Sequence, residues 1–268
     1  MNLYLRAITM FSLFLLALFA QTSASFAQTR DLIVTKDQVR EAEVQLQDVM
    51  EFIDPELLRK TIPEVEAIGL SDKSPLAQAR LGILWNEVAL NFAFLKQGAM
   101  KGYAEKSYML LSSVLEDPAT PPGLVPFVAS YRASSLALWA GESGSLGKVW
   151  QAFKLFDDAV RRYATVSYSP EFLRGSVAEN LPWYFFKTRV AIEDFSSILA
   201  KAEADSAFAN PRILSFTYWA WAFNQKKAGF SKAQREQALN YLDRAIALDP
   251  EYKAGRARAE KLKAEILR

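Results

Sequence analysis

The chain of 268 residues contains neither histidine nor cysteine. Histidine is the side chain that most often acts as a general base, so its absence excludes Ser-His triads, zinc peptidase sites and nearly all imidazole metal sites. The absence of cysteine excludes thiol catalysis, haem attachment, iron–sulfur clusters and disulfides. An enzyme with this sequence would depend on Asp, Glu, Lys, Tyr or Arg alone. We therefore expect a protein that is not an enzyme, with no catalytic residue, no metal site and no cofactor.

A strong charge of one sign is missing as well. The chain has 32 basic and 30 acidic side chains, and Arg6 is the only charged residue among residues 1–27, so the chain from residue 28 carries a net charge of +1. This balance gives no electrostatic case for binding nucleic acid or an anionic membrane. Long apolar runs are also missing after residue 27. The uncharged run from Pro118 to Tyr131 is too short to cross a bilayer and contains several prolines, so we expect no membrane span in the mature chain.

Residues 1–27 have the organisation of a secretory signal peptide. Arg6 provides the positive start, residues 7–20 form an uncharged apolar stretch, and Ser25-Phe26-Ala27 is a small-x-small cleavage site before Gln28. The apolar stretch is shorter than the roughly 20 residues that a membrane span needs. We expect export and cleavage after Ala27, and the bacterial periplasm is the compartment that we infer.

The composition and the proline positions predict an all-α protein. Hydrophobic residues make up 51% of the chain and aromatic residues 13%, which is enough for a sizeable core. A good helix-capping side chain stands directly before a proline at five places, and proline is well suited to the first position of a helix. The five pairs are Asp54-Pro55, Ser74-Pro75, Ser169-Pro170, Asn210-Pro211 and Asp249-Pro250.

Hydrophobic periodicity places helices along the whole chain after residue 35. In the first, Thr35 and Gln38 fit a capping box. A short element beginning at Pro55 is expected to be interrupted near Pro63, and Gly141–Gly144 are expected to form a loop. The main predicted helices cover 36–53, 75–95, 103–115, 124–140, 146–164, 182–200 and 251–268, with a further pair between 211 and 249.

The stretch from Gln237 to Pro250 contains a helix-packing pattern. Ala238 and Ala245 are small and allow a neighbouring backbone to approach closely, Leu242 fills the groove between them, and Pro250 ends the helix. This pattern resembles the second helix of a tetratricopeptide repeat (TPR). The resemblance implies antiparallel helix pairs that stack side by side and bind other proteins. Its matching residues are structural, so no binding residue is carried over from them.

Weaker copies of the same pattern occur earlier in the chain. Ala152, Phe156 and Ala159 are in register, whereas Leu110 and Ser113 follow a lysine where a small residue belongs. The resemblance covers roughly 75–164 and 211–268, and its spacing is less regular than the family's. We expect a degenerate TPR-like array of antiparallel helix pairs, either an α-α superhelix or a compact irregular helical bundle. It would form a single domain over 28–268, in which 28–70 form an N-terminal helical segment that either joins the array or stands apart.

Two aromatic clusters, 183–186 and 216–223, are the most unusual local features. Aromatic rings usually pack in the core, but Trp and Tyr are also favoured at binding surfaces. The candidate binding-surface residues are Trp183, Tyr184 and Trp219.

The sequence is compatible with three functions. The leading hypothesis is an exported, non-catalytic scaffold that binds a protein or peptide partner in a TPR-like groove. The alternative is a periplasmic helical protein that binds a small apolar ligand or acts with a TRAP-type solute transporter, whose TPR partner proteins are similar in outline. The third is a carboxylate-dependent glycan-cleaving enzyme, which needs two carboxylates at a catalytic separation that no spacing here predicts.

Overall fold

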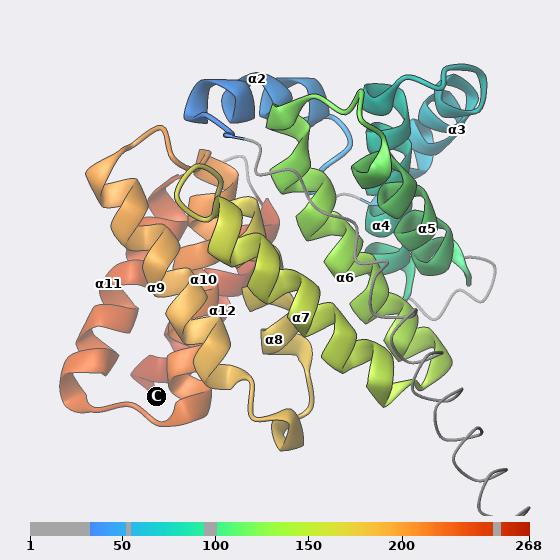
Figure 1. Cartoon of the computed structure of the whole chain (residues 1–268). Helices are drawn as coiled ribbons and strands as arrows, with labels where there is room; N and C mark the ends of the chain where they lie inside the picture. Colours follow the sequence, from blue (N-terminus) through green and yellow to red (C-terminus); the bar gives the residue numbers. More distant parts are fainter. Residues whose placement is uncertain (1–32, 52–54, 94–100, 249–252) are drawn as a thin grey trace, which may run out of the picture. The chain divides into compact units, whose positions relative to one another are not determined.

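The computed structural model describes residues 33–51, 55–93, 101–248 and 253–268, and Val34–Arg268 form one compact unit. The described residues contain eleven α-helices, two short 3-10 helices and no strand, so the chain is an all-α protein (Figure 1). The α-helices are α2 (Lys36–Leu46), α3 (Pro55–Ser71), α4 (Pro75–Ala93), α5 (Tyr103–Glu116), α6 (Val125–Ser143), α7 (Leu146–Tyr163), α8 (Ser169–Asn180), α9 (Thr188–Ala204), α10 (Pro211–Ala228), α11 (Lys232–Leu248) and α12 (Lys253–Leu267). The 3-10 helices are η2 (Pro122–Leu124) and η3 (Trp183–Phe185).

Helix α2 begins with the predicted capping box. The Gln38 amide donates to the Thr35 hydroxyl at 3.3 Å, and the Thr35 amide donates to the Gln38 side-chain oxygen at 3.0 Å. The helix ends at Leu46, earlier than predicted. The chain then turns and reaches Glu51 in the left-handed region, with φ 58°. Glu51 thereby enters the interior instead of continuing a helix. The residues predicted to extend this helix through Ile53 lie partly outside the described residues.

The proline starts are confirmed at three positions and shifted at a fourth. Helix α3 begins at Pro55, as predicted. Helix α4 begins at Pro75 after Ser74, and α10 begins at Pro211 after Asn210, whose side chain accepts the Ile213 amide at 3.0 Å. Helix α8 begins one residue earlier than predicted, at Ser169, so Ser169 is not its N-cap. The predicted caps Asp54 and Asp249 lie outside the described residues.

Two predicted interruptions are wrong, and one interruption that the structure contains was not predicted. Helix α3 continues through Pro63, which is exposed and removes one backbone donor from the helix without ending it. Helix α6 continues to Ser143 and ends at Gly144, which takes the left-handed conformation of a C-cap with φ 67°. The predicted helix over 182–200 is instead the 3-10 turn η3 followed by α9, because Phe186 adopts a left-handed conformation with φ 54°.

Neighbouring helices in the chain pack against each other in space. Each helix from α4 to α7 contacts the next one in the chain, and so does each helix from α8 to α12. The even-numbered helices also touch one another in sequence, α4 with α6, α6 with α8, α8 with α10, and α10 with α12. From α4 to α12, each even-numbered helix therefore contacts the next even-numbered helix directly, in addition to the odd-numbered helix between them in the chain.

The predicted packing positions are buried in two of the three copies. In α11 the buried residues are Ala238, Leu242 and Ala245. In α7 the predicted small, bulky and small positions are likewise among the buried residues.

In α5 the predicted register is wrong by one residue. Leu110 and Ser113 are not buried there, and the buried residues at that spacing are Ser107, Leu111 and Val114. The small residue that permits close approach is on the partner helix, where a Cβ added to Gly82 of α4 would lie 2.5 Å from Leu111.

The described residues contain no helix with the length and hydropathy needed to cross a bilayer. The predicted signal peptide over 1–27 lies outside the described residues.

Candidate functional site

Five large side chains form an exposed patch, which we call the aromatic surface. Its residues come from two elements, Leu146 and Trp150 from the first turns of α7, and Trp183, Tyr184 and Phe186 from η3 and its end. Trp183 is 80% exposed and Phe186 78%, and the other three are between 55% and 61% exposed. Leaving so much apolar area in water is unfavourable, so such patches usually mark a contact site.

A short ordered turn holds the aromatic rings of η3 in place. Pro182 precedes the turn, the Phe185 amide donates to the Pro182 carbonyl at 3.0 Å, and the Phe186 amide donates to the Trp183 carbonyl at 3.0 Å. The Trp183 ring packs edge-to-face on Tyr184 and on Phe186, with ring centroids 6.1 Å and 6.2 Å apart. Trp183 and Phe186 are each more than three-quarters exposed, so their rings project from the bundle on an ordered turn.

The turn is tied to α7 through one further aromatic residue. The ring of Phe185 lies 6.3 Å from the ring of Trp150, centroid to centroid. The Lys187 ammonium lies 5.6 Å from the centroid of Trp150 and 4.3 Å from that of Phe153. These contacts join the two parts of the aromatic surface.

The candidate residues from the sequence differ in their exposure. Trp183 and Tyr184 lie on the aromatic surface. Trp219 is only partly exposed, because its ring stacks on Phe223 at 5.4 Å and the Arg258 guanidinium of α12 lies 5.2 Å from its centroid. Helix α12 thus covers part of the second aromatic cluster.

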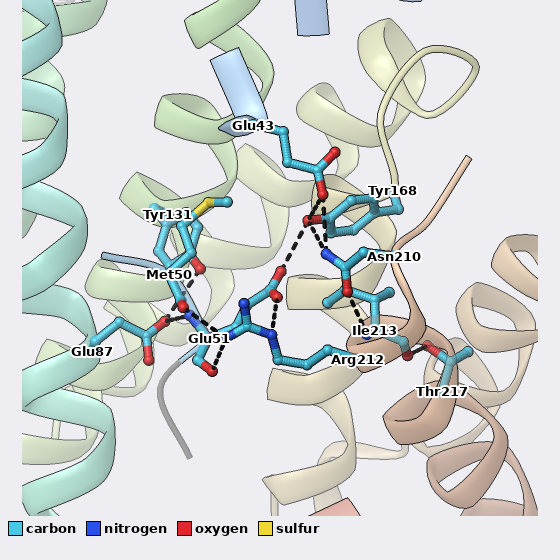
Figure 2. Close-up of polar contacts among 10 residues, drawn as sticks. All are labelled: Glu43, Met50, Glu51, Glu87, Tyr131, Tyr168, Asn210, Arg212, Ile213 and Thr217. Carbon is cyan, nitrogen blue, oxygen red and sulfur yellow. Dashed lines mark hydrogen bonds and ion pairs between the residues drawn. The ribbon is translucent and has the colours of Figure 1, made fainter. Parts of the chain in front are cut away.

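A buried polar cluster lies where the end of the α2 segment meets α10 (Figure 2). The Tyr168 hydroxyl lies 3.0 Å from Oε1 of Glu43 and 3.0 Å from Oε1 of Glu51. From α10, the Arg212 guanidinium donates to the Glu51 carbonyl at 3.1 Å, and its Nε lies 3.4 Å from the Glu51 carboxylate. The Asn210 amide donates to Glu43 at 3.0 Å. These contacts connect residues more than 100 positions apart in the chain.

A second branch of the same cluster reaches α4 and α6. The Glu51 amide donates to Oε1 of Glu87 at 3.1 Å, and the Tyr131 hydroxyl donates to the same oxygen at 3.2 Å. Figure 2 shows Glu51 between the two branches, with Glu87 and Tyr131 on one side and Arg212 and Tyr168 on the other. Glu51 is therefore the residue that joins α4 and α6 to α10.

Burial changes the acidity of these groups. Loss of hydration raises the pKa of Glu51 to about 7, although Arg212 and the Tyr168 hydrogen bond act in the opposite direction. Burial also raises the pKa of Tyr131 and of Tyr168 well above the usual value, and the neighbouring carboxylates add to this effect. Both tyrosines are therefore neutral donors.

Among the residues that the structure describes, the polar cluster connects helices and leaves no room for a ligand. The cavity beside it, bordered by Lys36, Glu43, Tyr168 and Asp205 among others, has a volume of about 10 Å³, which accommodates about one water molecule. In the part of the chain that the structure describes, no group of three or more acidic side chains is arranged to hold a metal ion. The adjacent Asp157 and Asp158 form separate ion pairs, Asp157 with Arg174 and Asp158 with Arg161 and Arg162.

Comparisons with protein-family models, with curated proteins and with solved structures found no match to this chain. The fold and the two sites define the chain as an all-α protein with an exposed aromatic surface and a buried polar cluster.

Sequence reasoning missed part of both sites. The spacing of four between Leu146 and Trp150 puts both on one helix face, and it could have added them to the aromatic surface. Phe186 could not be found in this way, because its exposure depends on the left-handed turn. The contact of Glu51 with Glu87 and Arg212 has no local signal.

Proposed function

We propose that the chain is an exported, non-catalytic helical scaffold of the periplasm that binds a protein or peptide partner through the aromatic surface. The observation that carries this proposal is the exposure of Trp183 and Phe186 in a turn whose backbone is already ordered. Trp and Tyr dominate the binding free energy of many protein interfaces because they bury a large area and lose little side-chain entropy. A preformed turn also lowers the entropy lost on binding.

The helix contacts support a TPR-like arrangement for this scaffold. The contacts of each even-numbered helix from α4 to α12 with the next one, and with the odd-numbered helix between them in the chain, are those that stacked helix pairs would make. The burial of Ala238, Leu242 and Ala245 also agrees with the TPR pattern. We place the binding surface on α7 and η3, and thus outside the groove that the family uses.

No observation favours the small-ligand alternative or a TRAP-type role in the same way. The small-ligand hypothesis needs Trp183, Trp219 and Trp221 to line one apolar pocket, but Trp183 is 80% exposed and Trp221 only 5%. The Trp221 indole donates to Ser196 at 2.8 Å, and its ring packs on Tyr241. These side chains belong to two different environments.

Site-specific photo-crosslinking in the producing cell tests the proposal. A photoreactive phenylalanine analogue replaces Tyr184 in one variant and Met109, which is 60% exposed on α5, in a control variant. The proposal predicts a discrete protein adduct from position 184 that is absent from position 109. Equal labelling at both positions, or no adduct at 184, contradicts it.

A further inference from the structure

The two segments that build the aromatic surface have an uneven charge. Residues 144–156 and 180–189 together contain four basic side chains and no acidic one, although the whole chain is nearly balanced. The four are Lys148, Lys154, Lys187 and Arg189. Lys154, one helical turn after Trp150, and Lys187, whose ammonium lies 5.6 Å from the Trp150 centroid, therefore place positive charge beside the aromatic surface.

Two of these cations, Lys154 and Lys187, are near the aromatic surface and make no ion pair within the residues that the structure describes. Lys148 is two residues from both Leu146 and Trp150 and is therefore on the opposite side of α7, over Trp139 of α6. Arg189 pairs with Glu193 at 2.7 Å on the exposed surface, and exposed pairs of this kind are weak.

From this charge pattern we propose that the partner segment is acidic and carries large apolar side chains. The inference rests on the proposed function and assigns a chemistry to its partner. Apolar side chains would cover Leu146, Trp150 and the η3 rings, and carboxylates would lie beside the two unpaired lysines. Complementary charge at the edge of an apolar contact speeds association and selects among partners.

The shape of the surface favours a polypeptide segment as the occupant. Leu146 and Trp150 lie one helical turn apart along α7, and the η3 rings stand beside them, joined by the contact between Phe185 and Trp150. A strip with a ring cluster at its side suits a chain that runs along α7. An anionic bilayer, which is flat, is the competing occupant, and the experiment distinguishes the two.

Selection from a random 12-residue peptide library tests the inference. The purified protein is compared with the double variant Trp183→Ala/Phe186→Ala and with a charge-reversed variant, Lys154→Glu/Lys187→Glu. We expect the native protein to enrich peptides with net negative charge and at least one large apolar residue. The double variant should lose this enrichment, and the charge-reversed variant should enrich peptides of net positive charge.

The matched control reverses two exposed lysines elsewhere, Lys60→Glu/Lys232→Glu, with the same change in net charge. It should retain the native selection. Circular dichroism melts establish that each variant is folded.

The results distinguish a failure of the acidic-partner inference from a failure of the proposed function. If the enriched peptides depend on Trp183 and Phe186 but carry no net negative charge, or if the charge reversal does not change them, the acidic partner is ruled out and the binding surface remains. If no enrichment depends on those two residues, the proposed function fails together with the inference. Co-sedimentation with phosphatidylglycerol vesicles but not with phosphatidylcholine vesicles, lost in the double variant, would assign the surface to lipid and overturn the inference.

Discussion

The Arg212 guanidinium of α10 faces the buried carboxylate of Glu51, with 3.4 Å between Nε and Oε2. The same guanidinium also donates to the backbone carbonyl of Glu51 at 3.1 Å. One arginine thus fixes both the side chain and the left-handed backbone of Glu51. This contact attaches the N-terminal segment to the rest of the compact unit.

The pKa of Glu51 predicts a pH-dependent stability. Its pKa is raised from 4.5 to about 7 in the folded protein, so between these values the folded state binds a proton that the unfolded state has released. The free energy of unfolding should therefore decrease as the pH rises from about 4.5 to 7 and then level off, by about 1–3 kcal/mol from this group.

The variant Glu51→Gln tests this dependence by urea unfolding at pH 5 and pH 8. We expect the difference in stability between the two pH values to be smaller in the variant, because glutamine keeps the shape without the ionisation. Part of the dependence should persist, since burial also raises the pKa of Glu179 to about 7 and that of Asp194 to about 6. An unchanged pH difference would show that Glu51 ionises normally in the fold.

Gly82 should be intolerant of a side chain, unlike Gly141. A Cβ at position 82 would lie 2.5 Å from Leu111, which is fully buried, whereas a Cβ at position 141 would meet nothing within 4 Å. We expect Gly82→Ala to destabilise the protein by about 1–3 kcal/mol. Gly141→Ala should stabilise it by about 0.5–1 kcal/mol, because alanine favours the helix. Thermal melts that rank the two variants in the reverse order would contradict the α4–α5 contact.

Enlarging Ala245 tests the packing pattern of α11. Ala245 is fully buried, and its carbonyl accepts the Ser215 hydroxyl of α10 at 2.9 Å, so the two backbones are close. Ala245→Leu should destabilise the protein by about 1–3 kcal/mol. Ala247→Leu, at an exposed position of the same helix, is the control and should have almost no effect. Similar melting temperatures for both variants would exclude close packing of α10 on α11.

The sequence predicted the features that depend on local chemistry. The capping box at Thr35, the start of α10 after Asn210 and the buried alanines of α11 all follow from residues within one or two turns of each other. The errors occurred where distant contacts decide the structure. The α5 register depends on Leu111 filling the space beside Gly82 of α4, and no residue near Leu111 indicates that partner.

The candidate site divides in the same way. Trp183 and Tyr184 were found because an aromatic run is visible in the sequence. Trp219 is less exposed than expected because Arg258, 39 positions later, lies over its ring. The charge at the border of the aromatic surface was hidden, since Lys154 and Lys187 come together only when η3 packs beside α7.

The exposed aromatic residues should contribute little to stability. Trp183→Ala should change the free energy of unfolding by less than about 0.5 kcal/mol, because the side chain is already in water. Trp221→Ala, at a buried position of α10, should cost about 3–5 kcal/mol. Chemical denaturation of the two variants provides the measurement. A large loss on removal of Trp183 would mean that its ring serves the fold and would weaken the case for binding.

The central claim is tested most directly by calorimetry with purified proteins. The affinity of the crosslinked partner for the native protein is compared with its affinity for the Trp183→Ala variant. Met109→Ala serves as the control, since Met109 is exposed on α5, outside the aromatic surface. We predict that Trp183→Ala weakens binding by about 10-fold or more without loss of stability, as expected for an interface hot spot, and that Met109→Ala leaves the affinity unchanged. Equal affinity of the native protein and Trp183→Ala would contradict the claim that the aromatic surface is the binding site.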